Sequence, residues 1–352
     1  MSQDNTPDDD STLLSSRVRD TDDATILGMR QAAPSQSSQR QQVGPSDVRH
    51  FAQVFTSLVT NISHVVLGKR DVIKLVATAL FADGHVLLED NPGTGKTQLA
   101  RGLANSLRAS FKRLQFTPDL LPSDVVGVTF YDQEKARFTF REGPIFASVV
   151  LADEINRASP KTQSALLEVM EEQRVTVDGV SHAVPQPFIV IATQNPIEQL
   201  GTYRLPEAQL DRFLIKTSLG NPSHQASLSI LKQATVADRA SGVRPVITDA
   251  QVQPLRDIAA GVYVHDSLLE YVTRLVEATR HDARHIEVGA STRGALALVR
   301  CAKVFAAADG RNYVIPDDVS ALARPVLAHR LVLTSEAKFA GTTPEKLIDD
   351  IV

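Results

Sequence analysis

The chain has 352 residues, of which 37 are basic and 41 acidic, so its formal net charge is −4. This length is enough for two packed domains. The slight acidic excess and the lack of a basic cluster argue against duplex nucleic acid as the main partner, because such binding depends on neutralising phosphates. No apolar run approaches the roughly 20 residues of a membrane-spanning helix, so we expect no membrane insertion.

The first 48 residues contain no aromatic residue and no lysine, and are rich in Asp, Ser, Gln, Thr and Pro. Such a tract cannot bury enough apolar surface to offset its chain entropy, so residues 1–48 are predicted to form a disordered tail. The tail lacks the basic start and apolar centre of a secretory signal. A single cysteine, Cys301, excludes a disulfide framework and is expected to be a buried thiol. These features together predict a cytoplasmic protein.

A glycine-rich turn follows the first strongly apolar run of the chain. Residues 85–88 predict a buried strand, and leucines at 99, 103 and 107 then recur at helical spacing. Strand, glycine-rich turn and helix in this order form the context of a phosphate-binding loop, in which backbone N–H groups and the helix N-terminus attract phosphate. A flexible turn is the alternative. The predicted loop consists of Asp90, Asn91, Pro92, Gly93, Thr94, Gly95, Lys96 and Thr97.

Two loop residues have the chemistry that a bound triphosphate requires. Lys96 is predicted to reach the β- and γ-phosphates, and the Thr97 hydroxyl to bind Mg²⁺. Asp90 occupies the place where this motif usually has its first glycine. Aspartate tolerates left-handed backbone better than most residues, but its charge must point away from the phosphates. The loop therefore predicts ATP and Mg²⁺ as cofactors.

A second short apolar run, residues 148–152, ends in two adjacent carboxylates. Side chains at a strand end alternate in direction, so Asp153 and Glu154 can have different roles. Asp153 suits contact with Mg²⁺, and Glu154 suits orienting and polarising the attacking water. An ordinary solvated strand end is the alternative. Another candidate strand, residues 113–116, precedes this run, and indicates the branch of nucleotide hydrolases that has an additional strand.

A third apolar run, residues 188–193, leads into Gln194, Asn195 and Pro196. Pro196 has no N–H for a strand ladder and stops the strand. Asn195 would then lie at the carboxyl edge of the sheet, where its amide could hold water near the γ-phosphate. An asparagine that only caps a turn is the alternative.

Other local signals predict elements around this core. Ser159 and Pro160 predict the start of a helix. Asp178-Gly179 predicts a two-residue turn between strands at 174–177 and 180–184. From about residue 221 onward the pattern is helical, with one helix capped by Ser291 or Thr292. His281 and His285 have helical spacing, but no third ligand lies nearby in the sequence, so a polar surface segment is favoured over a metal site.

Three long motifs, at residues 115–124, 151–172 and 192–213, closely resemble the MoxR family of AAA+ ATPases. The resemblance covers roughly residues 50–350. It implies an α/β AAA+ core, with a parallel sheet flanked by helices, at residues 49–219. An all-α lid domain is expected to follow at residues 220–352.

The resemblance also implies roles for individual residues. Asp153 and Glu154 fall on the Walker B pair, and Asn195 on sensor 1. Arg212 matches the arginine finger, which a neighbouring subunit supplies in trans. A salt bridge of Arg212 with Asp211 or Glu207 is the alternative, and Arg204 is the second candidate for the finger.

Two further assignments follow from the resemblance. Arg293 matches sensor 2, an arginine that contacts the γ-phosphate from the lid. Its place early in a helix opposes the helix dipole, which a phosphate partner would explain. Gly68 belongs to a segment that frames adenine in relatives, where Lys69 replaces a more usual Gln or Glu.

The function implied is ATP hydrolysis coupled to chaperone-like remodelling or activation of a separate protein. Partners with von Willebrand factor A domains and metal-centre maturation are known among relatives. A ring, most simply a hexamer, follows from the finger in trans. The alternatives are a nucleic-acid motor or clamp-loader-like ATPase, and a nucleotide-binding scaffold with little hydrolysis.

Overall fold

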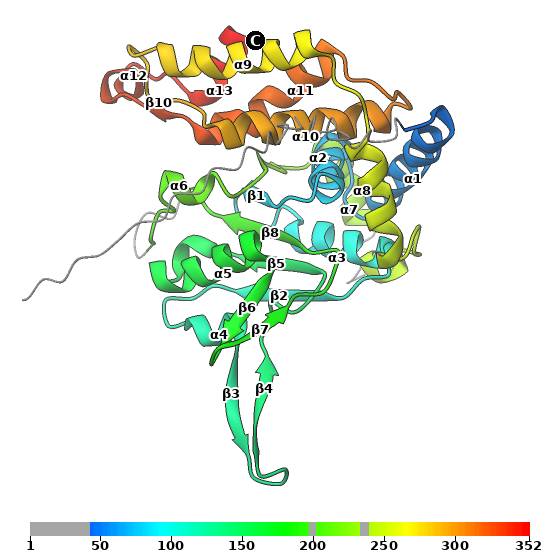
Figure 1. Ribbon diagram of the computed structural model, residues 1–352, viewed down its shortest axis with the longest axis vertical. Coiled ribbons are helices and arrows are strands. Elements are labelled where there is room, and N and C mark those ends of the chain that lie inside the picture. The colour runs from blue at the N-terminus through cyan, green and yellow to red at the C-terminus, as the bar shows by residue number, and fades with distance from the viewer. Residues whose placement is uncertain (1–42, 197–201, 233–238) are drawn as a thin grey trace, which may run out of the picture. The chain divides into compact units, whose positions relative to one another are not determined.

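The structure is a computed structural model, and it describes residues 43–196, 202–232 and 239–352 (Figure 1). Most of the predicted tail, residues 1–42, lies outside the described residues. Helix α1 begins at Pro45, and Val48 is buried against the core. Residues 45–48 are therefore part of the fold, which corrects the predicted tail boundary at residue 48. The proline at the first helical position and the buried face of α1 explain this earlier start.

The central sheet has five parallel strands in the order β2-β5-β8-β1-β9. Four of the strands confirm predicted ones, and β9 was not singled out. Strand β8 lies between the loop-bearing β1 and the carboxylate-bearing β5, whereas β2 lies at the edge. The sheet therefore has an additional strand between β1 and β5, but this strand is β8 and not the run at residues 113–116 from which it was expected. The strands are β1 Val86–Glu89, β2 Phe111–Gln115, β5 Val149–Asp153, β8 Ile189–Gln194 and β9 Ile215–Thr217.

Helices cover both faces of this sheet. Alternate residues of β5 pack into two different clusters: Val149 and Leu151 pack with α1–α3, and Val150 and Ala152 pack with α5. Burial on both faces explains why these strands are continuously apolar instead of alternating. The side chain of Ser159 caps α5, as predicted. The helices of this part are α1 Pro45–Ser63, α2 Arg70–Phe81, α3 Lys96–Ser106, α4 Pro122–Val126, η1 Ile155–Arg157, α5 Pro160–Glu172 and α6 Glu207–Leu210.

Two β-hairpins extend from the same side of the core in Figure 1. The predicted hairpin is present as β6 Arg174–Val177 and β7 Val180–Ala183, and Asp178 and Gly179 have φ of 50° and 78°. The other hairpin, β3 Gly127–Asp132 with β4 Arg137–Glu142, was not predicted. Gly127 at its base has a φ of 103°, and an added Cβ would lie 2.3 Å from the Arg141 carbonyl oxygen. Only glycine fits there.

The C-terminal part is mainly helical, and the predicted division at residues 219/220 falls between β9 and α7. It also contains a short antiparallel ribbon of β10 and β11, so the predicted all-α lid is not purely helical. Among the described residues, no helix is both long and apolar enough to cross a bilayer. Its elements are α7 His224–Lys232, η2 Arg239–Gly242, η3 Asp249–Gln251, α8 Val252–Ala260, α9 Asp266–His281, β10 Ile286–Val288, α10 Thr292–Ala308, α11 Pro316–Leu327, η4 Ala328–Arg330, β11 Val332–Leu333, α12 Ser335–Phe339 and α13 Pro344–Ile351.

Candidate nucleotide-binding and hydrolysis site

The predicted phosphate loop connects the carboxyl end of β1 to the first turn of α3. Gly93 and Gly95 have φ of 84° and 98°, a backbone region that disfavours other residues. A Cβ added at either glycine would meet no atom within 4 Å, so the loop borders open space. The first turn of α3 contains no acidic residue. The loop therefore offers an open cradle at a helix N-terminus, which suits an anion such as phosphate.

Lys96 lies at the first position of α3 and is largely buried. Its Nζ donates a hydrogen bond to the Asp90 carbonyl oxygen at 3.1 Å, so the side chain folds back along the loop. The charged end is therefore held across the cradle, where a phosphate oxygen can replace the carbonyl as its acceptor. Thr97 follows on the same turn and is half-buried.

The Asp90 carboxylate points away from the cradle, as predicted. It accepts three hydrogen bonds of 2.7 Å each, from Ser218 Oγ and from the backbone N–H groups of Leu219 and Gly220. These donors belong to the linker segment, residues 218–221, which follows β9 and leads toward α7. The backbone N–H of Asp90 donates to the Gln194 carbonyl oxygen at 3.1 Å. The loop is therefore connected to β8, which ends beside Asn195, and to the linker segment.

Asp153 and Glu154 end β5 at the same edge of the sheet, and their side chains make separate contacts. Asp153 Oδ1 accepts from Thr193 Oγ1 at 2.6 Å, and Oδ2 accepts from Arg113 at 2.7 Å. Glu154 has left-handed backbone, with φ 57° and ψ 48°. Its N–H donates to Thr193 Oγ1 at 2.9 Å. A single buried hydroxyl, that of Thr193, therefore holds both acidic residues.

The Glu154 carboxylate is itself held by two neighbours. Glu154 Oε2 accepts from Gln115 Nε2 at 2.7 Å and from Arg157 Nη1 at 2.9 Å. Gln115 ends the edge strand β2, and Arg157 belongs to η1. Asn195, the predicted sensor, follows β8 and is buried at this edge. The structure therefore brings the loop, both carboxylates and Asn195 to one edge of the sheet.

A hydroxyl and a carboxylate are the oxygen ligands that Mg²⁺ prefers, so Thr97 and Asp153 fit the ion chemically. No group of three or more His, Cys, Asp or Glu side chains that could hold a metal occurs among the described residues. The histidine pair considered in the sequence is separated, because α9 ends at His281 and His285 binds Asp282.

The predicted adenine segment lies against the region that follows the linker segment. Gly68 has a φ of 71°, and a Cβ added there would lie 3.3 Å from Ala226 Cβ. Lys69 Nζ donates to the Asn221 carbonyl oxygen at 2.6 Å. Lys69 therefore holds backbone of the linker segment in this structure.

Arg212 and Arg293 share one counter-ion, Glu171 near the end of α5. Arg212 Nη1 lies 2.7 Å from Glu171 Oε2, and Arg293 Nη1 lies 3.3 Å from Oε1. The alternative partners of Arg212 are not used: Asp211 instead binds Arg330 at 2.7 Å. The second finger candidate, Arg204, is exposed.

Both arginines lie at the amino edge of the sheet, opposite the loop. Arg212 precedes β9, whose first residue pairs with the first residue of β1. The loop follows the far end of β1, about 13 Å further along the strand. Glu171 is likewise about 16 Å along α5 from the start of the helix at Pro160, which follows Glu154 and η1. Arg293, expected to contact a γ-phosphate from the lid, therefore lies beside Arg212 and away from the loop of its own chain.

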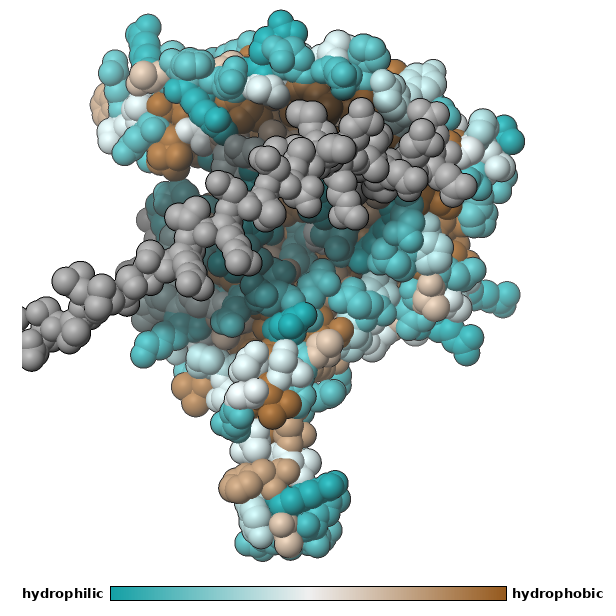
Figure 2. All heavy atoms as spheres, in the orientation of Figure 1, coloured by the Kyte–Doolittle hydropathy of each residue, from teal (hydrophilic) through white to brown (hydrophobic). Residues whose placement is uncertain are grey.

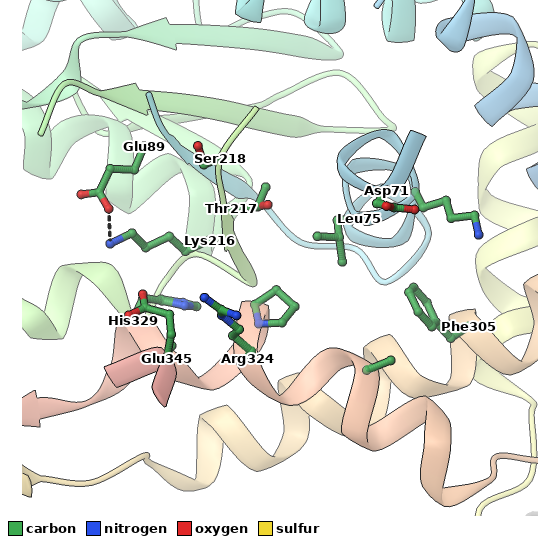
Figure 3. A pocket seen from close by; sticks show the side chains of 14 residues that line it. Asp71, Leu75, Glu89, Lys216, Thr217, Ser218, Phe305, Arg324, His329 and Glu345 are labelled. Atoms are coloured by element: carbon green, nitrogen blue, oxygen red, sulfur yellow. Dashed lines mark ion pairs between the residues drawn. The ribbon is translucent and has the colours of Figure 1, made fainter. Parts of the chain in front are cut away.

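A cavity of about 580 Å³ lies between the sheet edge and the lid helices. Figure 3 shows the ion pair of Glu89 and Lys216 on its core side, and His329, Arg324 and Glu345 on its lid side. Its lining includes Glu89, directly before the loop, but none of residues 90–97. The cavity is therefore a neighbour of the nucleotide cradle and not the cradle itself.

Two buried histidines beside these elements are structural. His85 donates from Nε2 to the Met170 carbonyl oxygen at 2.9 Å and accepts at Nδ1 from the Val190 N–H at 3.1 Å. Burial lowers the pKa of His85 to about 4. Burial, together with the adjacent Arg330, lowers the pKa of His329 well below its usual value. Both rings are therefore neutral at pH 7 and belong to the packing of the core and lid.

The sequence reasoning missed the residues that hold the carboxylates, namely Thr193, Arg113, Gln115 and Arg157. Thr193 and Gln115 lie within motifs that were recognised, but their partners are 39 or 40 positions away in the chain. The pairing of β2 with β5, which places Gln115 opposite Asp153, and the pairing of β5 with β8, which brings Thr193 beside it, reveal these contacts. The signal in the sequence that could have identified these residues was the polar residue at the end of each neighbouring strand.

Several known proteins are similar to this chain in sequence and fold. Residues 85–215 match the family described as ATPase family associated with various cellular activities (AAA), and residues 278–351 match the AAA lid domain. An uncharacterized protein, YeaC, of Bacillus subtilis is 49% identical over 84% of this chain and 92% of its own length. Chaperone MoxR1 of Mycobacterium tuberculosis is 40% identical over 84% of this chain and 80% of its own length. Protein MoxR of Paracoccus denitrificans is 32% identical over 82% and 91%.

A solved structure from Cytophaga hutchinsonii, described as a candidate ATPase, has the same fold. It superposes with a TM-score of 0.81 at 36% sequence identity. The match covers 87% of this chain and 95% of the other. The parallel sheet with a following helical lid is thus common to both proteins.

Proposed function

This chain belongs to the MoxR family of AAA+ ATPases, which hydrolyse ATP, and from this premise we propose that it couples hydrolysis to remodelling or activating a separate protein complex. The chain resembles a relative named as a chaperone along most of both sequences. Its core carries two hairpins with exposed apolar side chains, and these are the observation on which the proposal depends.

The double hairpin, β3–β4 with β6–β7, is proposed to contact the partner protein. Figure 2 shows apolar surface along the β3–β4 hairpin, amid largely hydrophilic surroundings. Phe138 is 74% exposed and Tyr131 53% exposed. A groove of about 670 Å³ lies between the hairpins, lined by Phe138, Phe140, Val180 and His182 among others. Exposed apolar groups of this extent on a two-stranded ribbon are typical of a protein-binding surface.

We propose one or more residues for each chemical role. Lys96 would hold the β- and γ-phosphates, and Thr97 and Asp153 would hold Mg²⁺, which neutralises charge on the phosphates when bound. Glu154 would orient the attacking water and accept its proton, and Asn195 would fix that water from β8. The Gln115 and Arg157 contacts keep the Glu154 carboxylate in a defined position before water arrives.

A ring is proposed because Arg212 cannot reach the loop of its own chain. It lies beyond the amino ends of β1 and β9, whereas the loop lies beyond their carboxyl ends. Since Arg293 shares Glu171 with Arg212, both arginines would be supplied together to a neighbour's triphosphate. A closed ring with this head-to-tail contact, most simply a hexamer, completes every site.

The proposal is tested with a Glu154→Gln variant, which should bind ATP and retain its partner without turning over. The variant is immobilised with ATP, and the retained proteins are identified and purified. A retained protein supports the proposal only if it raises the ATPase rate of the unsubstituted chain. Lys96→Ala, which should not bind ATP, is the control for nucleotide dependence.

Two other results would point to different functions. Stimulation by DNA or RNA, with steep salt dependence, would indicate a nucleic-acid motor. Equally slow turnover of the unsubstituted chain and Glu154→Gln would indicate a scaffold. We further propose that the partner either has a von Willebrand factor A domain or is a metalloenzyme whose metal centre is matured. Identification of the retained protein would distinguish these two roles.

A further inference from the structure

The linker segment between core and lid is held by both predicted nucleotide-binding segments. Asp90, in the phosphate loop, binds Ser218, Leu219 and Gly220 through its carboxylate. Lys69, in the adenine segment, binds the Asn221 carbonyl oxygen. Four consecutive linker residues are therefore attached to the two segments between which a nucleotide would lie.

The contact of Asp90 with the linker is difficult to break. Asp90 is 3% exposed, and its three hydrogen bonds all come from the linker segment. A buried carboxylate that loses its donors has a large desolvation cost, so the linker cannot leave the loop alone. Gly220 has a φ of 59°, which fixes the turn of the chain at this point. Loop and linker therefore move together.

The same residue also contacts the group that would bind phosphate. The Asp90 carbonyl oxygen accepts from Lys96 Nζ, the group predicted to transfer to phosphate. Its N–H is bonded to Gln194, next to Asn195. If Lys96 turned to a phosphate, the backbone of Asp90 would lose this restraint, while its side chain would still bind residues 218–220.

We infer that Asp90 is a positioning residue for ATP hydrolysis, and that it transmits the occupancy of the phosphate loop to the lid through the linker segment. The lid carries Arg293, and it docks on the core through Arg330 and Asp211 at 2.7 Å. A linker shift at one edge of the sheet is thus converted into a lid shift that moves Arg293 at the other edge. A glycine at position 90, the more usual residue of the motif, would leave the loop intact and remove this connection.

The test measures nucleotide binding, turnover and lid position in the full chain. Asp90→Gly, Asp90→Asn and Ser218→Ala are compared with Asp257→Asn, a substitution of an exposed aspartate on α8. Dissociation constants are measured with a fluorescent ATP analogue, and kcat and KM with Mg-ATP. Circular dichroism melting shows that each variant is folded.

Lid position is measured by electron spin resonance between labels at Ser164→Cys on α5 and Glu277→Cys on α9. The native thiol need not be removed, because Cys301 is fully buried and burial raises its pKa to about 12. A Glu154→Gln background prevents turnover, and excess unlabelled chain suppresses distances between subunits.

In the unsubstituted chain, ATP is expected to shift the distance between the labels. Asp90→Gly should keep the dissociation constant within about threefold, because glycine is compatible with the loop. It should also lower kcat about tenfold and abolish the ATP-dependent shift. Ser218→Ala, which leaves the loop untouched, should reduce the shift in part, and Asp257→Asn should change nothing.

Three results would overturn the inference: no ATP-dependent shift in the unsubstituted chain, an unaltered shift in Asp90→Gly, or a loss of ATP affinity in Asp90→Gly with kcat preserved. The last result would show that Asp90 only shapes the loop. The test needs no partner protein, so its failure is distinct from a failure of the proposed remodelling function.

Discussion

Replacing Thr193 by valine removes one buried hydroxyl and nearly nothing else. Thr193 is completely buried, and its Oγ1 bonds to Asp153 Oδ1 at 2.6 Å and to the Glu154 N–H at 2.9 Å. Valine has almost the same shape, so the change leaves a carboxylate oxygen and a backbone N–H without their partner. Each such loss costs about 1–3 kcal/mol, which gives a total of about 2–6 kcal/mol in the free energy of unfolding.

The effect on turnover should exceed the effect on binding. Glu154 is held in left-handed backbone, which is unfavourable for residues other than glycine. Without the Thr193 hydroxyl, the end of β5 can relax and displace the Glu154 carboxylate. A displacement of about 1 Å at a reacting group costs on the order of 10²-fold in rate. We expect kcat of Thr193→Val to fall by about 10–100-fold with little change in KM.

Stability is measured by chemical denaturation followed by far-UV circular dichroism, because the chain has no tryptophan. Turnover is measured by phosphate release. Thr193→Ser keeps the hydroxyl and is the matched control, expected to retain most of the activity. If Thr193→Val matched the unsubstituted chain in both kcat and denaturation midpoint, the assigned role of this hydroxyl would be refuted.

Three other predictions follow from the structure. Arg212→Ala and Lys96→Ala should each be inactive alone, with a loss of about 10³-fold for the arginine variant. An equal mixture should recover about a quarter of the activity, because about a quarter of the interfaces then combine an intact Lys96 with an intact Arg212 from the neighbouring subunit. A mixture without recovery would argue against an arginine supplied in trans. The neutral, buried His85, with a pKa of about 4 against 6.5 in the unfolded chain, contributes stability that is complete above pH 6.5 and is lost as pH falls toward 4. The loss should be about 2 kcal/mol at pH 5 and about 3 kcal/mol at pH 4, visible as a lower denaturation midpoint at pH 5 than at pH 7.5, and His85→Gln should flatten it. Phe138→Ser should leave basal turnover unchanged but reduce partner retention by the Glu154→Gln variant at least tenfold, and equal retention would exclude this side chain as a contact.

Local signals in the sequence predicted the strands and helix starts around the candidate site. The apolar runs before the loop, before Asp153 and before Asn195 became β1, β5 and β8, since strands buried on both faces are continuously apolar. The side chain of Ser159 caps α5, and Ser291 caps α10. In each case, the signal and the structure that it predicts lie within a few residues of each other.

Features that depend on distant partners were missed or misplaced. The sequence does not show that Thr193 lies between Asp153 and Glu154, because strand order decides it. The motif of Arg293 does not show which loop it can reach, and the docking of the lid on Asp211 places it beside Arg212. The β3–β4 hairpin was overlooked because its apolar residues lie on both faces of the ribbon, as Phe130 and Tyr131 do, and are not buried on one.

The two oxygens of Glu171 have a consequence for how subunits would separate. In an isolated chain, Arg212 and Arg293 already have an anionic partner, so neither cation is left uncompensated. In the proposed ring, the triphosphate bound to a neighbouring subunit would therefore replace Glu171 as the anionic partner of the arginines. The net gain in binding free energy between the subunits would be small. A diphosphate presents less charge and competes less well with the carboxylate. Each hydrolysis event would thus return the arginines to Glu171 and weaken the interface between the two subunits. The interface would form again when ATP replaces the diphosphate.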